Sequence, residues 1–281
     1  MTKFIVTSDT GSGSLDQYKV AESMEDLIED HKINSVLLLG DNIYETGVTS
    51  INDPQFITKF EDPYKNIKKP FYLCLGNHDY GNSFLLKSNS QFQIDYSDIS
   101  KKWNMPSKYY SIVKNPCEFF FLDTNLDVMS ESQIMIQFKI MADKLKKSKQ
   151  KWKIVCGHHP WRSVGGHGNA DSRFESFMND LCEESKFHLY MCGHDHCKNI
   201  ILKNDPVDDS IISLLVIGTG GKIYHGGEDG RPQMHNIKEG DSELLFHSPN
   251  LGVCLLDVTK KRIILTCYDE NLIEEFKYTI K

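Results

Sequence analysis

Six apolar segments of this chain, each four or five residues long, end in a turn that contains glycine. Short apolar segments of this kind predict strands, here at 4–7, 35–39, 71–75, 152–156, 188–192 and 214–217. The turns after them are Asp9-Thr10-Gly11, Gly40-Asp41-Asn42-Ile43-Tyr44, Gly76-Asn77-His78-Asp79, Gly157-His158-His159-Pro160, Gly193-His194-Asp195-His196 and Gly218-Thr219-Gly220-Gly221. In α/β proteins, ligands gather beyond the carboxyl ends of the strands, where such turns lie close together. The pattern therefore predicts an α/β fold in which distant parts of the chain meet at one crevice.

Five of the six turns carry side chains of the types that bind metals in proteins. Six of the eleven histidines belong to these turns or follow one closely: His78, His158, His159, His167, His194 and His196. Carboxylates, carboxamides and imidazoles together suit divalent or trivalent first-row metals, and their number is sufficient for two ions. A lone histidine or aspartate at a strand end is usually structural or a helix cap, but packing alone does not explain five such turns. A structural zinc site around Cys192 and Cys197 is disfavoured by the spacing of the two cysteines.

The segments between the predicted strands indicate helices that cover a sheet. Helical periodicity is found at 16–31, 130–147 and 171–184, and a further strand is predicted at 119–122. In the second of these helices, one face carries the apolar residues Ile134, Phe138, Met141 and Leu145. That spacing predicts a helix lying against a sheet.

The last thirty residues have a different pattern. Three segments, 252–258, 262–268 and 273–280, follow one another with turn-like breaks, which predicts antiparallel strands. The segments 203–210 and 225–250 are predicted to be surface loops. Because no repeat or linker divides the chain, we expect a single domain over residues 1–281.

Charge and composition exclude several classes of function. The net charge is −7, from 32 Lys and Arg against 39 Asp and Glu, which argues against a nucleic-acid or membrane partner. Met1-Thr2-Lys3 is followed by only a short apolar segment, so we expect a cytoplasmic protein, or a secreted or lysosomal one whose leader has been removed. The eight cysteines include no C-x-x-C pair, and we expect most of them to be buried free thiols.

Five motifs occur in a defined order along the chain. They are D-x-G from Asp9, G-D-x-x-Y from Gly40, G-N-H-D from Gly76, G-H-x-P from Gly157 and G-H-x-H from Gly193. Further segments match between them: Thr46-Gly47-Val48, Ile51-Asn52-Asp53, Phe60-Glu61-Asp62, Lys102-Trp103-Asn104, Pro106-Ser107 and Leu122-Asp123-Thr124. With these residues nearly the whole chain resembles the metallophosphoesterases, and among them the small purple acid phosphatases of the mammalian, tartrate-resistant (uteroferrin-like) type.

The resemblance implies both a fold and a metal centre. The implied α/β fold is a four-layer α-β-β-α sandwich, with two mixed sheets flanked by helices and antiparallel strands near the C-terminus. The implied ligands of the first metal, normally Fe(III), are Asp9, Tyr44 and His196. Those of the second metal, a divalent iron, zinc or manganese ion, are Asn77, His158 and His194, with Asp41 bridging the two.

Tyr44 distinguishes this type of centre from others in the superfamily. Most metallophosphoesterases have D-x-H as their first motif, whereas Gly11 replaces that histidine here and Tyr44 is available to fill the vacant position. A tyrosinate is a hard anionic donor that favours Fe(III), and its charge transfer to iron gives the resembled family its purple colour. The alternative is a ring packed beside the turn with its hydroxyl hydrogen-bonded.

His78 and His167 are the expected catalytic residues. His78 directly follows Asn77, so it can face the substrate from another angle when Asn77 faces a metal. His167 lies nine positions after His158, the separation that the resembled family shows for its second substrate-facing histidine, although Gly166 stands where that family has Glu. The resemblance implies that both bind phosphate and protonate the leaving group.

The implied function is that of a dimetal acid phosphatase. A metal-bound hydroxide would attack the phosphorus of a monoester directly, and protonation by an imidazole would favour mildly acidic conditions. The expected substrate is a small phosphomonoester or a phosphoprotein, and the oligomeric state is left open. Two alternatives remain, namely a phosphodiesterase or nucleotide pyrophosphohydrolase with the same dimetal centre, and a catalytically degenerate scaffold that binds phosphate or a protein.

Overall fold

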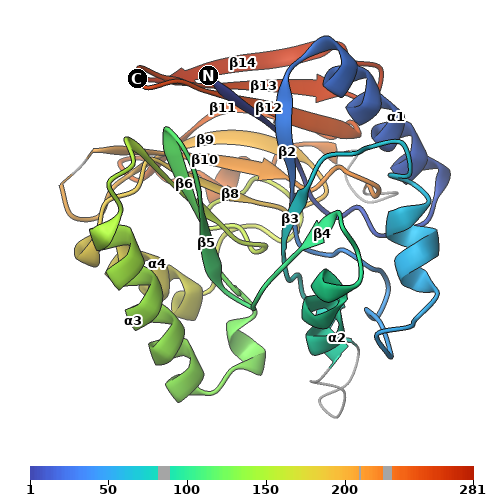
Figure 1. Ribbon diagram of the computed structural model, residues 1–281. Helices are drawn as coiled ribbons and strands as arrows, with labels where there is room; N and C mark the ends of the chain where they lie inside the picture. Colours follow the sequence, from blue (N-terminus) through green and yellow to red (C-terminus); the bar gives the residue numbers. More distant parts are fainter. Residues whose placement is uncertain (82–88, 209, 224–229) are drawn as a thin grey trace.

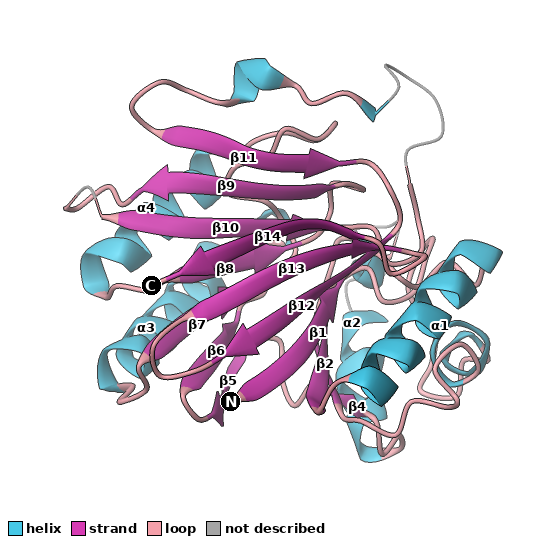
Figure 2. Cartoon of the chain, turned by 90° about the horizontal axis from the view of Figure 1, so that it is seen from above, coloured by secondary structure: helices cyan, strands magenta, loops and turns pink. Residues whose placement is uncertain are grey.

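In the computed structural model the chain forms a sandwich of two mixed sheets with helices on both outer sides (Figures 1 and 2). Over residues 1–81, 89–208, 210–223 and 230–281, which the structure describes, each sheet has seven strands. The helices α1 (Leu15–Asp30) and α2 (Asn89–Asp95) lie beside the first sheet, and α3 (Glu131–Lys147) and α4 (Ser172–Glu184) cover the second. The expected α-β-β-α arrangement is therefore confirmed.

The first sheet has the strand order β14-β13-β12-β1-β2-β3-β4. Its parallel strands are β1 (Thr2–Thr7), β2 (Ile33–Leu39), β3 (Phe71–Cys74) and β4 (Trp103–Asn104). Its antiparallel strands are β12 (Gly252–Val258), β13 (Ile263–Asp269) and β14 (Glu274–Ile280). The antiparallel pairing predicted for the end of the chain is thus confirmed.

The second sheet has the strand order β11-β9-β10-β8-β7-β6-β5. Its parallel strands are β6 (Cys117–Phe121), β7 (Trp152–Cys156), β8 (Leu189–Cys192) and β10 (Ile211–Ile217). Its antiparallel strands are β5 (Tyr110–Lys114), β9 (Lys198–Asn204) and β11 (Ser242–Ser248). The six strands predicted to lead into glycine turns are therefore all parallel strands, three in each sheet.

The two predicted surface loops contain strand residues, so both predictions are wrong in part. β9 extends into 203–210, and β11 lies inside 225–250; residues 224–229 of that segment are outside the described part of the chain. β11 is an edge strand that pairs only with β9, and most of its side chains are half-buried. Without a buried apolar face, it lacks the alternation by which a strand is found in a sequence.

The strand β9 was missed because polar side chains interrupt its apolar segment. Lys198 is fully buried, donates to the carbonyl of Leu251 at 3.0 Å and forms an ion pair with Glu275. Lys203 is 3% exposed and pairs with Asp241 at 2.9 Å. A buried ammonium is tolerated here because each has a carboxylate partner, which the local sequence does not reveal.

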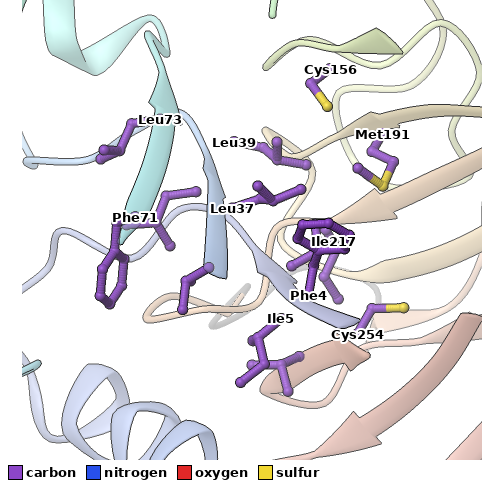
Figure 3. Packing of buried hydrophobic residues seen from close by; sticks show 14 of the residues in the cluster. Phe4, Ile5, Leu37, Leu39, Phe71, Leu73, Cys156, Met191, Ile217 and Cys254 are labelled. Atoms are coloured by element: carbon purple, nitrogen blue, oxygen red, sulfur yellow. The ribbon is translucent and has the colours of Figure 1, made fainter. Parts of the chain in front are cut away.

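The main core lies between the sheets, and β6 shows how it is filled. Phe119 faces this core, where its ring lies 4.8 Å from that of Phe4 in an edge-to-face arrangement, whereas Phe120 faces the helices. Figure 3 shows side chains from both sheets pointing into the shared core, among them Met191 and Ile217. Burial on both faces explains why these strands are continuous apolar segments rather than alternating ones.

The helices on the second sheet follow the predicted pattern. α3 begins after a capping box in which Ser130 and Gln133 satisfy each other's backbone N–H groups. Its predicted apolar face packs on the sheet through the half-buried Ile134 and Phe138 and the buried Met141 and Leu145. All eight cysteines are buried free thiols. No helix in the described residues has the length and apolar character needed to cross a bilayer.

Truncating the inter-sheet core should destabilise the whole protein. Phe119→Ala removes a fully buried ring, so the free energy of unfolding should fall by about 3–5 kcal/mol with an unchanged denaturant slope. Urea titrations followed by circular dichroism and by tryptophan fluorescence would measure this. Val113→Ala, at a side chain that is 55% exposed, is the control and should change stability by less than about 0.5 kcal/mol. Two separate unfolding transitions, or a loss below about 1 kcal/mol for Phe119→Ala, would contradict a shared core.

Candidate metal centre

The glycine turns of both sheets meet at one end of the sandwich. The turn after β1 binds the turn after β2, because the N–H of Asp9 donates to the carbonyl of Gly40 at 3.0 Å. The same aspartate reaches the other sheet, where its Oδ2 accepts the N–H of His194 at 2.9 Å. The N–H of Gly220, after β10, donates to the carbonyl of Ser8 at 2.9 Å. Segments as far apart in the sequence as Ser8 and Gly220 therefore form one cluster.

Two glycines are required by the close approach of these turns. A Cβ atom at Gly193 would lie 2.0 Å from Oγ of Ser8 and 2.4 Å from Oδ2 of Asp9. A Cβ atom at Gly76 would lie 2.1 Å from Oδ1 of Asp41. Any larger residue would push the carboxylates out of place, so glycine here positions functional groups rather than merely turning the chain.

Three of the predicted ligands have a strained backbone. Asp9, Asp41 and His194 have φ angles of 58°, 51° and 69°, a region that residues with a Cβ rarely adopt. Among the described non-glycine residues, only Leu272 also has a positive φ. Such strain is typically found at functional sites, where the surrounding structure holds a side chain in a required direction.

One group of predicted ligands surrounds His158. Ligand atoms of Asp41, His158 and His194 all lie within 4.8 Å of one another, which is the spacing of side chains that share a metal ion. Nε2 of His158 is 3.4 Å from Oδ2 of Asp41, 3.3 Å from Nδ1 of His194 and 3.1 Å from Oδ1 of Asn77. Nδ1 of His158 lies 2.8 Å from the carbonyl of Leu39, to which it donates, so Nε2 is the ring nitrogen that faces the other predicted ligands.

A second group surrounds the hydroxyl of Tyr44. This hydroxyl donates to Oδ1 of Asp9 at 2.8 Å and lies 3.2 Å from Nε2 of His196. The same nitrogen is 3.4 Å from Oδ1 of Asp9. Asp41 is close enough to Tyr44 to perturb its phenol, so it lies between the two groups. The structure thus brings all seven predicted ligands together, in the two sets that the sequence analysis expected.

The charges of the cluster favour a cation. Burial and the carboxylates of Asp9 and Asp41 raise the pKa of Tyr44 far above the range of a phenol, so the chain alone keeps it protonated. Burial opposes the charge on Asp9, but the hydrogen bond with His196 and the charge of His158 hold its pKa well below the usual value. Burial likewise opposes the charge on His158, and Asp41 raises its pKa to about 9. Buried carboxylates, a phenol, imidazoles and a carboxamide form a donor set that fits first-row metal ions.

Two further buried aspartates hold the turns that carry the ligands. Asp79 accepts the N–H of Gly76 at 2.8 Å, the N–H of Asn42 at 3.0 Å and the amide of Gln93 at 2.8 Å. Burial and the charge of Asp41 raise the pKa of Asp79 to about 6.

At the end of the second sheet, Asp195 holds a turn in the same way as Asp79 does at the first. It accepts the N–H of His167 at 2.7 Å and that of Gly168 at 3.3 Å, and it also accepts the hydroxyl of Ser163. The two aspartates therefore fix backbone N–H groups, each beside predicted ligands or substrate-facing histidines.

The two predicted catalytic histidines lie on different sides of the cluster. Nδ1 of His78 is 2.6 Å from the carbonyl of Glu45, and its Nε2 faces Oδ2 of Asp41 at 4.0 Å. The ring of His167 packs against that of His194, with centroids 4.0 Å apart. Both are therefore within reach of a group bound at the cluster.

An open pocket of about 280 Å³ lies next to the second group of ligands. Its polar wall includes Asn77, His159, His167 and His194, and its apolar wall includes Tyr80, Leu126, Pro160 and Phe174. Nδ1 of His159 lies 2.8 Å from Oγ1 of Thr124. Burial and the neighbouring His158 lower the pKa of His159 to about 3, which keeps this ring neutral and apart from proton transfer at ordinary pH.

Sequence reasoning assigned no role to two residues that support the cluster, Thr124 and Gln93, although Thr124 lies in one of the matching segments. Oγ1 of Thr124 accepts the N–H groups of His158 and His159 at 3.2 and 3.0 Å. Thr124 follows the end of β6 just as the ligands follow their strands, and this position was an available signal. Gln93, on α2, contacts only Asp79 and Asn42 of the site, and nothing in the local sequence indicates this.

Comparison with known proteins places the chain among phosphoesterases. The model of the calcineurin-like phosphoesterase family matches residues 2–198. Purple acid phosphatase 4 of Arabidopsis thaliana is 32% identical over 244 residues, which cover 79% of this chain and 69% of the relative. Human tartrate-resistant acid phosphatase type 5 is 33% identical over 184 residues, which cover 57% of this chain and 54% of the relative.

Two solved structures share the fold over the whole of this chain. GAP50, the anchor in the inner membrane complex of Plasmodium, matches with a TM-score of 0.78 at 20% identity and is covered to 88%. The purple acid phosphatase PPD1 from yellow lupin seeds matches with a TM-score of 0.72 at 17% identity and is covered to 53%. At these identities the two likenesses show the fold alone.

Removing the negative charge of Asp41 should strongly weaken metal binding. Asp41→Asn keeps an acceptor for the N–H of His78 but loses the anionic oxygen that faces His158, so metal content should fall from two ions per chain to one or none. The affinity for metal should fall by more than about 100-fold. That figure is the upper end of the loss caused by removing a residue that only hydrogen-bonds to a ligand, and Asp41 is a proposed ligand itself. Elemental analysis after dialysis would measure this, with the exposed Asp26→Asn on α1 as control. Two ions retained by a folded Asp41→Asn protein would contradict the site.

Proposed function

The chain belongs to the calcineurin-like phosphoesterase family and, within it, to the purple acid phosphatases, and from this premise we propose that two metal ions held by its seven clustered side chains hydrolyse phosphate monoesters. Membership makes the protein a metal-dependent phosphoric monoester hydrolase. The observation that carries the site assignment is the convergence of Asp41, His158 and His194 within 4.8 Å, next to Tyr44 hydrogen-bonded to Asp9.

The two groups of ligands would hold different ions. Asp9 supplies an anionic oxygen, Tyr44 supplies a phenol oxygen that becomes anionic when it binds a cation, and His196 supplies an imidazole nitrogen. This supports Fe(III) at the first position.

The second group has a different donor set. Asn77, His158 and His194 supply a neutral carboxamide oxygen and neutral imidazoles, which suit a divalent iron, zinc or manganese ion. Asp41, between the groups, would bridge both ions.

The chain's own residues would then orient the substrate and move its proton. When bound, the two ions would polarise a phosphoryl oxygen and activate a water molecule for attack in line with the leaving group. His78 is held by the carbonyl of Glu45 through Nδ1, so its Nε2 would face a phosphate oxygen or the leaving group. His167, held by Asp195 through its backbone N–H, would protonate a leaving group seated in the adjacent pocket. The need for a protonated imidazole supports activity under mildly acidic conditions.

The first test separates monoester from diester hydrolysis. The purified protein should hydrolyse nitrophenyl phosphate with a kcat/KM at least about tenfold higher than for bis(nitrophenyl) phosphate, a preference of about 1.4 kcal/mol in the transition state. The measurement is initial-rate kinetics on metal-replete protein, with Asp41→Asn as the inactive control. A preference for the diester would favour the phosphodiesterase alternative. Two bound metals with no hydrolysis of either ester would favour a binding scaffold.

The second test concerns leaving-group protonation. His78→Asn and His167→Asn should each be assayed with an alkyl phosphate and with nitrophenyl phosphate. A general acid contributes about 10²–10⁴-fold, and an alkoxide needs this proton far more than a nitrophenolate does. At least one variant should therefore lose about 100-fold or more in kcat on the alkyl phosphate, with a much smaller loss on nitrophenyl phosphate.

The control for this test is His31→Asn, at the end of α1 and near the start of β2, away from the carboxyl ends that carry the site. It should hydrolyse both esters as the wild type does. Equal losses on the two esters in both active-site variants would show that neither histidine is the proton donor.

A further inference from the structure

A positive charge lies directly over the ring of Tyr44. Lys222 follows the glycine turn that ends β10, and its Nζ lies 3.8 Å from the centroid of the tyrosine ring. The ring is buried at 1% exposure, whereas the side chain of Lys222 is 28% exposed. The ammonium therefore covers the ring of one proposed ligand while reaching solvent itself.

Glu45 fixes Lys222 in this position. One oxygen of Glu45 accepts from Nζ of Lys222 at 2.6 Å, and this hydrogen bond lowers the pKa of Glu45. The carboxylate is 66% exposed, so the ion pair lies at the rim of the site. Lys59 also approaches Tyr44, but it donates to the backbone carbonyl and does not stack on the ring. Lys222 is thus the lysine whose ammonium lies over the ring of Tyr44, and the imidazole of His78 packs against the same ring with centroids 4.6 Å apart.

A cation over an aromatic face stabilises the electrons of that ring. In a tyrosine that is bound to a ferric ion as phenolate, the oxygen electrons donated to the metal are conjugated with the π electrons of the ring. Stabilising them weakens the donation, so the ferric state gains less from the ligand and the energy needed to move an electron from ring to metal rises. The carboxylate of Glu45 acts in the opposite direction, because it offsets the charge of Lys222.

We propose that Lys222 and Glu45 have opposite effects on Tyr44 as a metal ligand. Lys222 raises both the Fe(III)/Fe(II) midpoint potential and the energy of the tyrosinate absorption band. Glu45 lowers both quantities. This rests on the proposed function, since it takes Tyr44 as the ligand of a ferric ion. Lys222 acts through Tyr44 and does not touch the pocket that would hold the leaving group. It is a tuning residue, not a catalytic one.

The test compares visible spectra and redox potentials of the iron-loaded protein. Lys222→Met should move the band to longer wavelength and lower the midpoint potential, whereas Lys222→Arg, which keeps a cation over the ring, should match the wild type. Glu45→Gln should move both quantities in the opposite direction. Lys114→Met is the matched control, because Lys114 lies 4.7 Å from the ring of Tyr72 away from the metal centre, and it should change neither quantity.

Steady-state kinetics provide the second readout. KM for nitrophenyl phosphate should be unchanged in Lys222→Met. A rise in KM with an unchanged band and potential would overturn the proposal and make Lys222 a substrate contact. An unchanged band and potential in Lys222→Met would also overturn it, whatever the kinetics.

Failure of the proposed metal centre would have a separate signature. The variant Tyr44→Phe should abolish the band altogether, which assigns the band to this residue. If the iron-loaded wild type shows no absorption band that Tyr44→Phe removes, the ferric site and this inference are both refuted. A band that Tyr44→Phe removes but Lys222→Met leaves in place would refute the role of Lys222 alone.

Discussion

The whole site depends on the contact between the turn after β1 and the turn after β8. Asp9 accepts the N–H of His194 from the opposite sheet, and Gly193 leaves just enough room for its carboxylate. Here, as at the contacts of Gly220 with Ser8 and of His158 with Leu39, polar groups rather than apolar packing join the two sheets. Because Asp9 also accepts the hydroxyl of Tyr44, one carboxylate positions ligands from three strands. Both ligand groups contain side chains from both sheets, so a displacement of either sheet would pull apart the ligands within each group.

Such an arrangement costs stability in the chain itself. Asp9, Asp41 and Asp79 are buried, and Asp9 and Asp41 also have a strained backbone. Burial and the neighbouring charge of Asp41 raise the pKa of Asp79, because both disfavour a second negative charge at this place. The fold holds the cluster because a continuous core between the sheets lies beneath it and buried hydrogen bonds fix each turn. Cations bound at the cluster would relieve this repulsion, because the side chains alone do not balance the negative charges of the site.

The sequence was most informative where local chemistry and local structure coincide. A strand followed by a glycine turn with metal-binding residue types is a local pattern, so the parallel strands and the turns that hold all seven proposed ligands could be found from it. The resemblance to a known family then selected the ligands among the residues of these turns. The residues that were missed act across the fold. Thr124 and Gln93 are recognised only through their hydrogen-bond partners, which lie far along the chain, and the buried Lys198 that conceals β9 is acceptable only because Glu275 pairs with it. Prediction from sequence ended where a residue's role is set by a distant partner.

The positions of the pocket and of Lys222 divide the centre into two functional sides. The pocket is lined by Asn77 and His194 of the second ligand group, and the first group does not contribute to its walls in the part of the chain that the structure describes. Lys222 and Glu45 lie instead against Tyr44, in the first group. The leaving group would then bind beside the ion of the second ligand group. Lys222 and Glu45 would set the redox potential of the ion in the first group. Under the two proposals, a substitution in the pocket wall would leave the environment of Tyr44 intact, and a substitution at Lys222 would leave the pocket intact. His78 links the two sides, because it is held by the carbonyl of Glu45 and packs against the ring of Tyr44.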